Sequence, residues 1–120
     1  MESEVIVDDV EVKNGLSVLT LKSLKENIKI ILELPTRIIR EAELNISRGA
    51  SLLLKIASSE FNEAPWKIYA EGVYYMKKTG NGNHTYYISI GGLQLKLLSD
   101  TPLDDFEKVK VMTKLYIALK

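Results

Sequence analysis

Residues 86–97 read Tyr-Tyr-Ile-Ser-Ile-Gly-Gly-Leu-Gln-Leu-Lys-Leu, and this stretch decides the fold. Apolar and polar residues alternate on both sides of the glycine pair, which is typical of β-strands with one buried face. The expected buried positions are even-numbered before the glycines (Ile88 and Ile90) and odd-numbered after them. A strand changes the parity of its buried face at a bend, and glycine removes the steric obstacle to bending. We therefore expect a barrel strand that turns a corner at Gly91 and Gly92.

Short segments of the same kind, separated by turn signals, run through the whole chain. The expected strands are a first one containing Val5, Val7, Val10 and Val12, then 16–22, 28–34, 51–58, 67–78, 85–90 and 93–97, and a last one running from Val109 to Leu119. About eight short strands predict an all-β fold, a closed or nearly closed antiparallel β-barrel that forms a single domain over residues 1–120.

Local signals refine this expectation. The apolar alternation of the first strand slips at Asp8-Asp9, which predicts a β-bulge. Asn14-Gly15 is a strong signal for a tight turn between the first two strands. Thr36–Leu44, which follows a proline, is the one expected short helix, and Thr101–Glu107 is expected to be a loop or a single helical turn.

Composition limits the classes of function. The chain has 120 residues, 46% of them hydrophobic, and no cysteine, which excludes disulfides, thiolate metal sites and cysteine nucleophiles. Sixteen basic residues balance sixteen acidic ones, whereas proteins that grip nucleic acid alone usually carry a basic excess. The acidic start, Met1 to Glu4, is unlike a signal peptide, so we expect a cytoplasmic protein, or a nuclear one in a eukaryote.

Residues with catalytic potential do not converge in the sequence. His84 stands beside a turn without an evident partner, and catalytic or metal-binding histidines need neighbouring groups. Asp8-Asp9 and Asp104-Asp105 are acidic pairs, but adjacent residues of a strand point to opposite faces. We therefore predict no catalytic residue, no metal site and no cofactor.

Tyrosines and lysines offer a possible binding surface. Tyr69 and Tyr75 are expected to share a strand face with Lys77, and tyrosine beside lysine on a barrel strand can stack on nucleic acid bases. Packing between aromatic side chains of neighbouring strands is the simpler interpretation. Lys108, Lys110 and Lys114 are expected on the solvent face of the last strand, where lysine discourages edge aggregation.

Four stretches together resemble the family of the eighth subunit that eukaryotic RNA polymerases share. Residues 86–97 are similar to the Tyr-Tyr-Ser-aromatic-Gly-Gly-Leu strand of that family, and Leu53–Ser59 to its strand ending in Ile-Ala-Ser-Ser. Ile68–Tyr75, with Gly72 at the glycine position, resembles the Tyr-x-x-Tyr-Gly-x-x-Tyr strand. Leu115–Lys120 resembles the closing apolar strand with a basic end.

One departure from the eukaryotic pattern is informative. Eukaryotic members carry a long polar loop after Ile-Ala-Ser-Ser, and only Glu60–Trp66 occupies that place here. The chain is therefore similar to a compact archaeal version of the subunit.

The resemblance implies an OB-type barrel that is a non-catalytic, peripheral subunit of DNA-directed RNA polymerase. Such a subunit docks on the largest subunit, away from the DNA cleft, and supports assembly and stability, while catalysis belongs to the large subunits. Direct binding of nucleic acid would be weak or absent, and no membrane would be involved. The candidate interface residues are Tyr87, Ser89, Gly91, Gly92 and Leu93.

The alternative is a stand-alone OB-fold protein that binds single-stranded nucleic acid. This function requires tyrosines and lysines gathered on one exposed face of the barrel.

Overall fold

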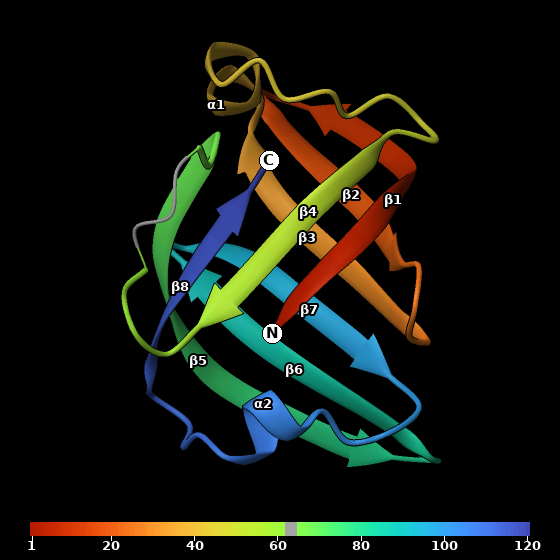
Figure 1. The fold of residues 1–120 in the computed structure, drawn as a ribbon, viewed down its shortest axis with the longest axis vertical. Helices are drawn as coiled ribbons and strands as arrows, with labels where there is room; N and C mark the ends of the chain where they lie inside the picture. The colour runs from red at the N-terminus through yellow and green to blue at the C-terminus, as the bar shows by residue number, and fades with distance from the viewer. Residues whose placement is uncertain (62–64) are drawn as a thin grey trace.

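Eight strands and two short helices make up the computed structural model, which describes residues 1–61 and 65–120 (Figure 1). The expected Glu60–Trp66 loop lies partly outside the described residues. The strands are β1 (Glu2–Lys13), β2 (Leu16–Ser23), β3 (Ile28–Pro35), β4 (Ser51–Ala57), β5 (Ile68–Gly80), β6 (Asn83–Ile90), β7 (Leu93–Ser99) and β8 (Lys114–Leu119).

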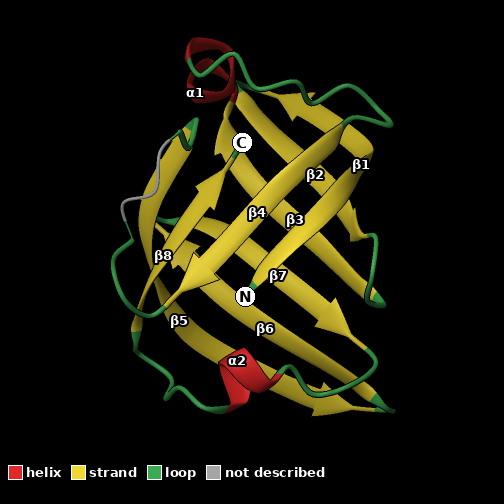
Figure 2. Cartoon of the chain, in the orientation of Figure 1, coloured by secondary structure: helices red, strands yellow, loops and turns green. Residues whose placement is uncertain are grey.

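The strands close into a barrel in the order β1-β2-β3-β7-β6-β5-β8-β4, and β4 pairs with β1 to complete it. Every neighbouring pair is antiparallel. Figure 2 shows the strands crossing the barrel obliquely, with loops at both ends. The all-β, OB-type antiparallel barrel predicted from the sequence is thereby confirmed.

Local predictions near the amino terminus also hold. The pairing of β1 with β2 shifts register between Val7 and Asp9, which is the bulge expected at Asp8-Asp9. Asn14 and Gly15 both have positive φ angles, 53° and 77°, as a type I′ hairpin turn requires. Val5 and Val7 before the bulge are fully buried and Val10 after it packs against the core, since one extra residue restores the alternation, whereas Val12 is exposed.

The two helices lie at opposite ends of the barrel (Figure 1). α1 (Thr36–Glu41) places Ile39 in the core, and α2 (Asp104–Glu107) does the same with Phe106. One helix was expected at Thr36–Leu44. α2 is the single turn that the sequence left open at Thr101–Glu107.

α1 ends earlier than expected because the chain adopts a Schellman motif. Glu43 takes a positive φ of 55°, and the Leu44 N–H donates to the Ile39 carbonyl at 3.2 Å. The Glu43 N–H donates to the Arg40 carbonyl at 3.1 Å. Residues 42–44 therefore complete the helix end and turn the chain away from it.

Gly91 and Gly92 form a hairpin turn and not the bend within one strand that the sequence analysis predicted. Ile88 pairs with Leu95 and Ile90 with Leu93 across the turn, and both glycines have positive φ angles. In a hairpin with a two-residue turn, the residue numbers of each cross-strand pair add to an odd number. An even-numbered buried residue before the turn therefore pairs with an odd-numbered buried residue after it, and no bend within a strand is needed.

A second bulge, between Tyr74 and Met76, changes the faces of β5. Tyr74 is inward and pairs with Ile88. Beyond the bulge Lys77 pairs with Tyr86, which is fully buried, and Met76 moves to the outer face. The sequence analysis expected Tyr75 and Lys77 to share a strand face, and the bulge shows that this prediction was wrong.

The last strand is shorter than predicted. β8 begins at Lys114, and Lys108 and Lys110 lie before it, in the helix cap and in a turn. β8 pairs with both β4 and β5. It has no open edge for lysine to protect, so the edge-protection role expected for the lysines does not apply.

Gly72 provides a test of the packing between strands. A Cβ atom there would lie 2.9 Å from the Ser89 carbonyl oxygen and 3.0 Å from Cγ2 of Ile88. We expect Gly72→Ala to lower the free energy of unfolding by about 1–3 kcal/mol through overpacking, measured by urea denaturation. Gly80→Ala is the control, since nothing lies within 4 Å of its Cβ position. Equal stability of the two variants would contradict the close packing.

Candidate functional site

The five candidate interface residues gather around the hairpin that joins β6 and β7. Tyr87 and Ser89 lie on the outer face of β6, because their neighbours Tyr86 and Ile88 are fully buried. Gly91 and Gly92 form the exposed turn, and Leu93 begins β7, half-buried. The hairpin therefore carries four of the five residues at its turn or on its outer face, while Leu93 follows the turn on the same face as the buried Leu95.

A shallow depression of about 450 Å³ lies beside this turn. Its lining residues are Glu33, Tyr75, Ser89, Gly92, Leu93 and Gln94. Three of the five candidates therefore share one depression with residues from β3, β5 and β7.

Two hydrogen bonds from Gln94 fix the walls of the depression. The Gln94 backbone N–H donates to Oε1 of Glu33 at 2.7 Å, and its side-chain amide donates to the Tyr75 hydroxyl at 2.6 Å. Strands β3, β7 and β5 are thereby connected across the outer surface, so the depression is preformed.

Tyr87 lies at the centre of a cluster of aromatic and basic side chains next to the depression. Its ring centroid is 6.1 Å from that of Tyr75. The ammonium groups of Lys78 and Lys96 lie 5.8 Å and 5.7 Å from the Tyr87 ring centroid, within the range of cation–π attraction. The outer face of β5, β6 and β7 therefore carries two tyrosines and two lysines.

Sequence reasoning did not find Glu33, Tyr75 and Gln94 as neighbours of the candidate residues. Gln94 could have been found, because a two-residue turn at Gly91-Gly92 places it opposite Ser89. Tyr75 could not, since its position depends on a bulge within a run of aromatic and apolar residues that shows no slip in alternation.

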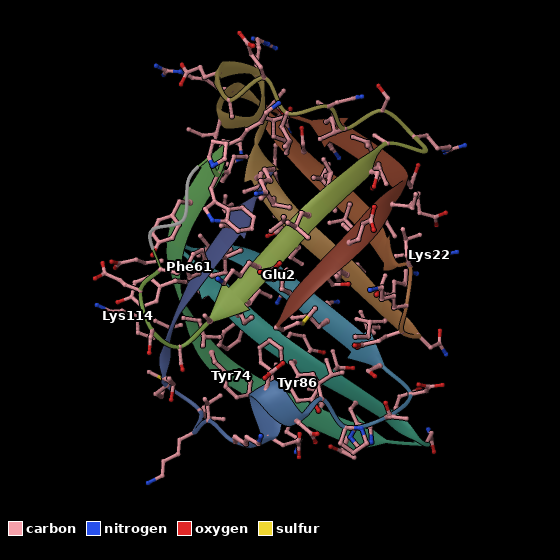
Figure 3. The ribbon with its side chains drawn as sticks, in the orientation of Figure 1. Glu2, Lys22, Phe61, Tyr74, Tyr86 and Lys114 are labelled. Carbon is pink, nitrogen blue, oxygen red and sulfur yellow. The ribbon has the colours of Figure 1, made fainter. Side chains whose placement is uncertain are left out.

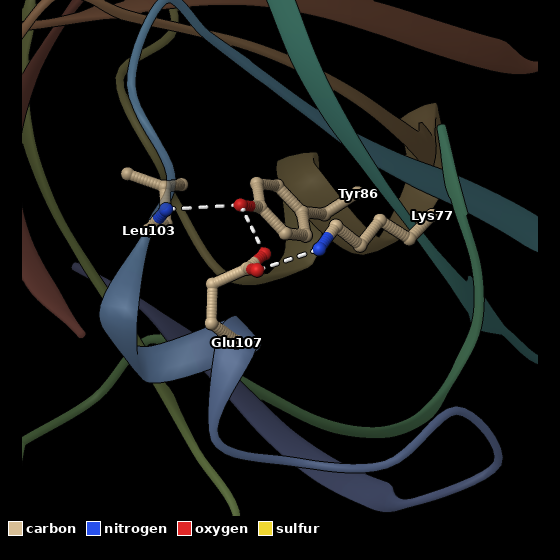
Figure 4. A network of polar contacts seen from close by, with 4 residues as sticks. All are labelled: Lys77, Tyr86, Leu103 and Glu107. Atoms are coloured by element: carbon tan, nitrogen blue, oxygen red, sulfur yellow. Dashed lines mark hydrogen bonds and ion pairs between the residues drawn. The ribbon is translucent and has the colours of Figure 1, made fainter. Parts of the chain in front are cut away.

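A second polar network closes the end of the barrel covered by α2 (Figure 4). The buried Tyr86 hydroxyl donates to Oε2 of Glu107 at 2.7 Å and accepts the Leu103 N–H at 2.9 Å. Lys77 donates to Oε1 of Glu107 at 2.6 Å. Figure 3 shows Tyr74 and Tyr86 directed towards this end, where both rings meet Phe106.

Burial and charge shift the pKa values in this network. Burial is the main cause that raises the pKa of Tyr86 to about 12, and the Glu107 carboxylate adds to it. Burial also raises the pKa of Tyr74. The hydrogen bond from Lys77, followed by that from Tyr86, lowers the pKa of Glu107. The network therefore favours a carboxylate beside a neutral phenol, an arrangement that holds α2 on the barrel.

The remaining sequence candidates lie apart from one another. Asp8 pairs with Lys22 and Asp9 with Arg48 at the first bulge, while Asp105 lies 3.4 Å from the amino-terminal nitrogen. His84 is half-buried in β6. Within residues 1–61 and 65–120, no three His, Cys, Asp or Glu side chains are grouped so that they could hold a metal ion.

Comparisons with known proteins identify no family for this chain. No protein-family model matches the chain, and no curated protein matches it. A solved structure of the cytoplasmic molybdate-binding protein ModG, with molybdate bound, is similar with a TM-score of 0.41 and 10% identity. The match covers 100% of this chain and 89% of that chain. Similarity at this level carries no argument about family or ligand. Among the described residues, no helix has the length and apolar character needed to cross a membrane.

The network at α2 predicts a pH dependence of stability. The pKa of Glu107 is lowered in the folded state, so the ionised carboxylate adds to the free energy of unfolding. This contribution is fully present above the ordinary carboxyl pKa and is lost as the pH falls through the pKa of Glu107 in the folded protein. We expect Glu107→Gln to be less stable than wild type at pH 7, with the difference shrinking at pH 3, by urea denaturation. Glu11→Gln, an exposed carboxyl on β1, is the control. A difference that is independent of pH would contradict the assignment.

Proposed function

We propose that this protein is a non-catalytic, peripheral subunit of DNA-directed RNA polymerase. It docks on the largest subunit through the outer face of the β6–β7 hairpin and supports assembly and stability of the enzyme. It acts within the cytoplasm of an archaeal cell, and catalysis stays with the large subunits.

The placement of the stretches that resemble the polymerase subunit family carries this proposal. Leu53–Ser59 includes most of β4, Ile68–Tyr75 lies in β5, residues 86–97 span β6 and β7, and Leu115–Lys120 includes most of β8. In the barrel these strands are consecutive, in the order β7-β6-β5-β8-β4. Stretches far apart in the sequence thus form one continuous wall of the barrel, and this wall can serve as a single docking surface.

Gly72 supports the same interpretation through its packing. The resemblance places glycine at this position, and a Cβ there would meet backbone of β6 and Cδ1 of Ile117 in β8 at 3.1 Å or less. Glycine at this position therefore allows β5, β6 and β8 to pack closely within that wall.

The hairpin turn suits docking because a partner can approach it closely. Nothing lies within 4 Å of a Cβ atom built at Gly91 or Gly92, so the space beyond both glycines is open. A partner backbone can therefore come near the turn, with the preformed depression of Ser89 and Leu93 beside it.

The alternative function, binding of single-stranded nucleic acid, has an observation in its favour. Tyr75, Tyr87, Lys78 and Lys96 lie together on one outer face, which is the arrangement that base stacking requires. The zero net charge of the chain weighs against it, because phosphate neutralisation drives such binding.

Two glycine substitutions test the proposal. Gly92 (φ +90°) and Gly82 (φ +76°) both lie in exposed hairpin turns with open space around a built Cβ. Valine at either position should cost about 1–3 kcal/mol of stability through backbone strain. We expect only Gly92→Val to reduce co-purification of the largest polymerase subunit with the tagged, folded chain, quantified by mass spectrometry against wild type.

Three results would change the account. Failure of the wild-type chain to bring down polymerase would contradict the subunit proposal. Equal recovery with both variants would keep the subunit and discard docking at the hairpin. Tight, salt-sensitive binding of the lone chain to a single-stranded oligonucleotide, lost in Tyr87→Ala, would favour the alternative function.

A further inference from the structure

The connection between α2 and β8 contains an unusual β-turn at residues 110–113. The Thr113 N–H donates to the Lys110 carbonyl at 3.1 Å, which defines a four-residue turn. Met112, at the third position, has a φ of +80°, whereas Val111 is absent from the residues with positive φ. This is the pattern of a type II turn, in which the third position favours glycine or asparagine. We call these four residues the Met112 turn.

Methionine at this position is unfavourable for the isolated chain. Among the described residues, the other non-glycine residues with positive φ are Asn14, Asn81 and Glu43. Asparagine tolerates the left-handed conformation, but an unbranched apolar side chain gains nothing there. Met112 is also 72% exposed and Val111 is 47% exposed. Strain and exposed apolar surface thus coincide at one turn, and backbone strain of this kind clusters at functional sites.

The Met112 turn is nevertheless held firmly on the barrel. The Met112 N–H donates to the Tyr74 carbonyl, and the Tyr74 N–H donates to the Thr113 carbonyl at 2.9 Å. Val109, just before the turn, is half-buried and packs against the core. The turn is therefore a fixed projection, and its two apolar side chains are presented with little conformational freedom left in the backbone.

Basic side chains surround the projection. Lys108, Lys110 and Lys114 are all exposed, and Lys114 lies 3.8 Å from Glu71. Figure 3 shows Lys114 directed outward where β8 begins. An apolar tip with a basic rim is complementary to an apolar pocket with an acidic rim.

The Met112 turn lies on the same wall as the β6–β7 hairpin. Lys114 pairs with Val73, Val73 with Ser89, and Ser89 with Gln94. This row crosses four neighbouring strands, a distance of roughly 14 Å at the usual strand spacing. One partner surface of standard size, about 800 Å² per side, can reach both features.

We propose that the Met112 turn is a second anchor for the polymerase subunit that docks on the hairpin, inserting Val111 and Met112 into an apolar pocket rimmed by carboxylates. This inference rests on the proposed function and deepens it. A protein pocket fits better than nucleic acid, because neither side chain has a flat ring for base stacking. It fits better than a lipid surface, because two apolar side chains bury too little area to hold a membrane. A rigid projection also loses little entropy on binding.

The test uses Met112→Gly, which separates stability from binding. Glycine relieves the strain, so the thermal midpoint of the folded chain should stay equal or rise. The affinity of the full chain for polymerase isolated from cells depleted of this chain should fall about tenfold or more, as for an anchor residue. Asn81→Gly is the control. It relieves a positive φ in the turn between β5 and β6, and it should leave the affinity for polymerase unchanged. Wild-type affinity should also weaken as salt rises, because the lysine rim faces acidic groups.

The outcomes separate the two proposals. Wild-type chain that fails to bind the depleted polymerase overturns both the subunit function and the anchor. Wild-type and Met112→Gly chains that bind with equal affinity overturn the anchor and leave the function standing. Binding to anionic phosphatidylglycerol vesicles or to a single-stranded oligonucleotide that is lost in Met112→Gly, with polymerase affinity intact, also overturns the anchor.

Discussion

Closure of the barrel is the constraint on which the rest of the structure depends. β4 pairs with β1 on one side and with β8 on the other, and this joins the amino-terminal strands to the carboxyl-terminal ones. Each strand has a paired neighbour on both sides, although β4 covers only Glu2–Ile6 of β1 and β8 covers only Ile68–Val73 of β5. Pairing on both sides limits the backbone edge that a partner could extend, so the proposed docking features are an outer face and two projecting turns, at Gly91-Gly92 and at Met112.

The bulge in β5 connects the interior of the barrel to this outer wall. It turns Lys77 inward to pair with Glu107, which holds α2 over the barrel end. It also leaves Tyr75 on the outer face, where its hydroxyl accepts a hydrogen bond from the Gln94 side-chain amide and its ring lies near that of Tyr87. One irregularity thus serves both the closure of the core and the construction of the candidate docking face.

The sequence predicted the features that depend on local alternation. Parity slips revealed the bulge at Asp8-Asp9, and Asn14-Gly15 revealed a hairpin. Gly91-Gly92 was assigned to a bend because the buried positions change from even to odd numbers there. A bend within one strand and a two-residue hairpin turn both produce this change in the sequence. Residues 108–113 alternate between apolar and polar like a strand, yet they precede β8 and form no part of it. The turn at Met112 and its backbone hydrogen bonds to Tyr74 fix this segment in a different conformation. Ser89, Gly92 and Leu93 of the depression were named as candidates from the sequence. Placing Glu33, Tyr75 and Gln94 beside them requires knowledge of the register between neighbouring strands.

Hydrogen exchange of the chain, free and bound to polymerase, tests docking through this wall most directly. The account predicts slower amide exchange in the complex at Gly91–Leu93 and at Lys110–Thr113. Exchange at the Asn14-Gly15 turn, between β1 and β2, should stay unchanged. Unchanged exchange at both of the first two segments, or protection confined to the Asn14-Gly15 turn, would contradict the account.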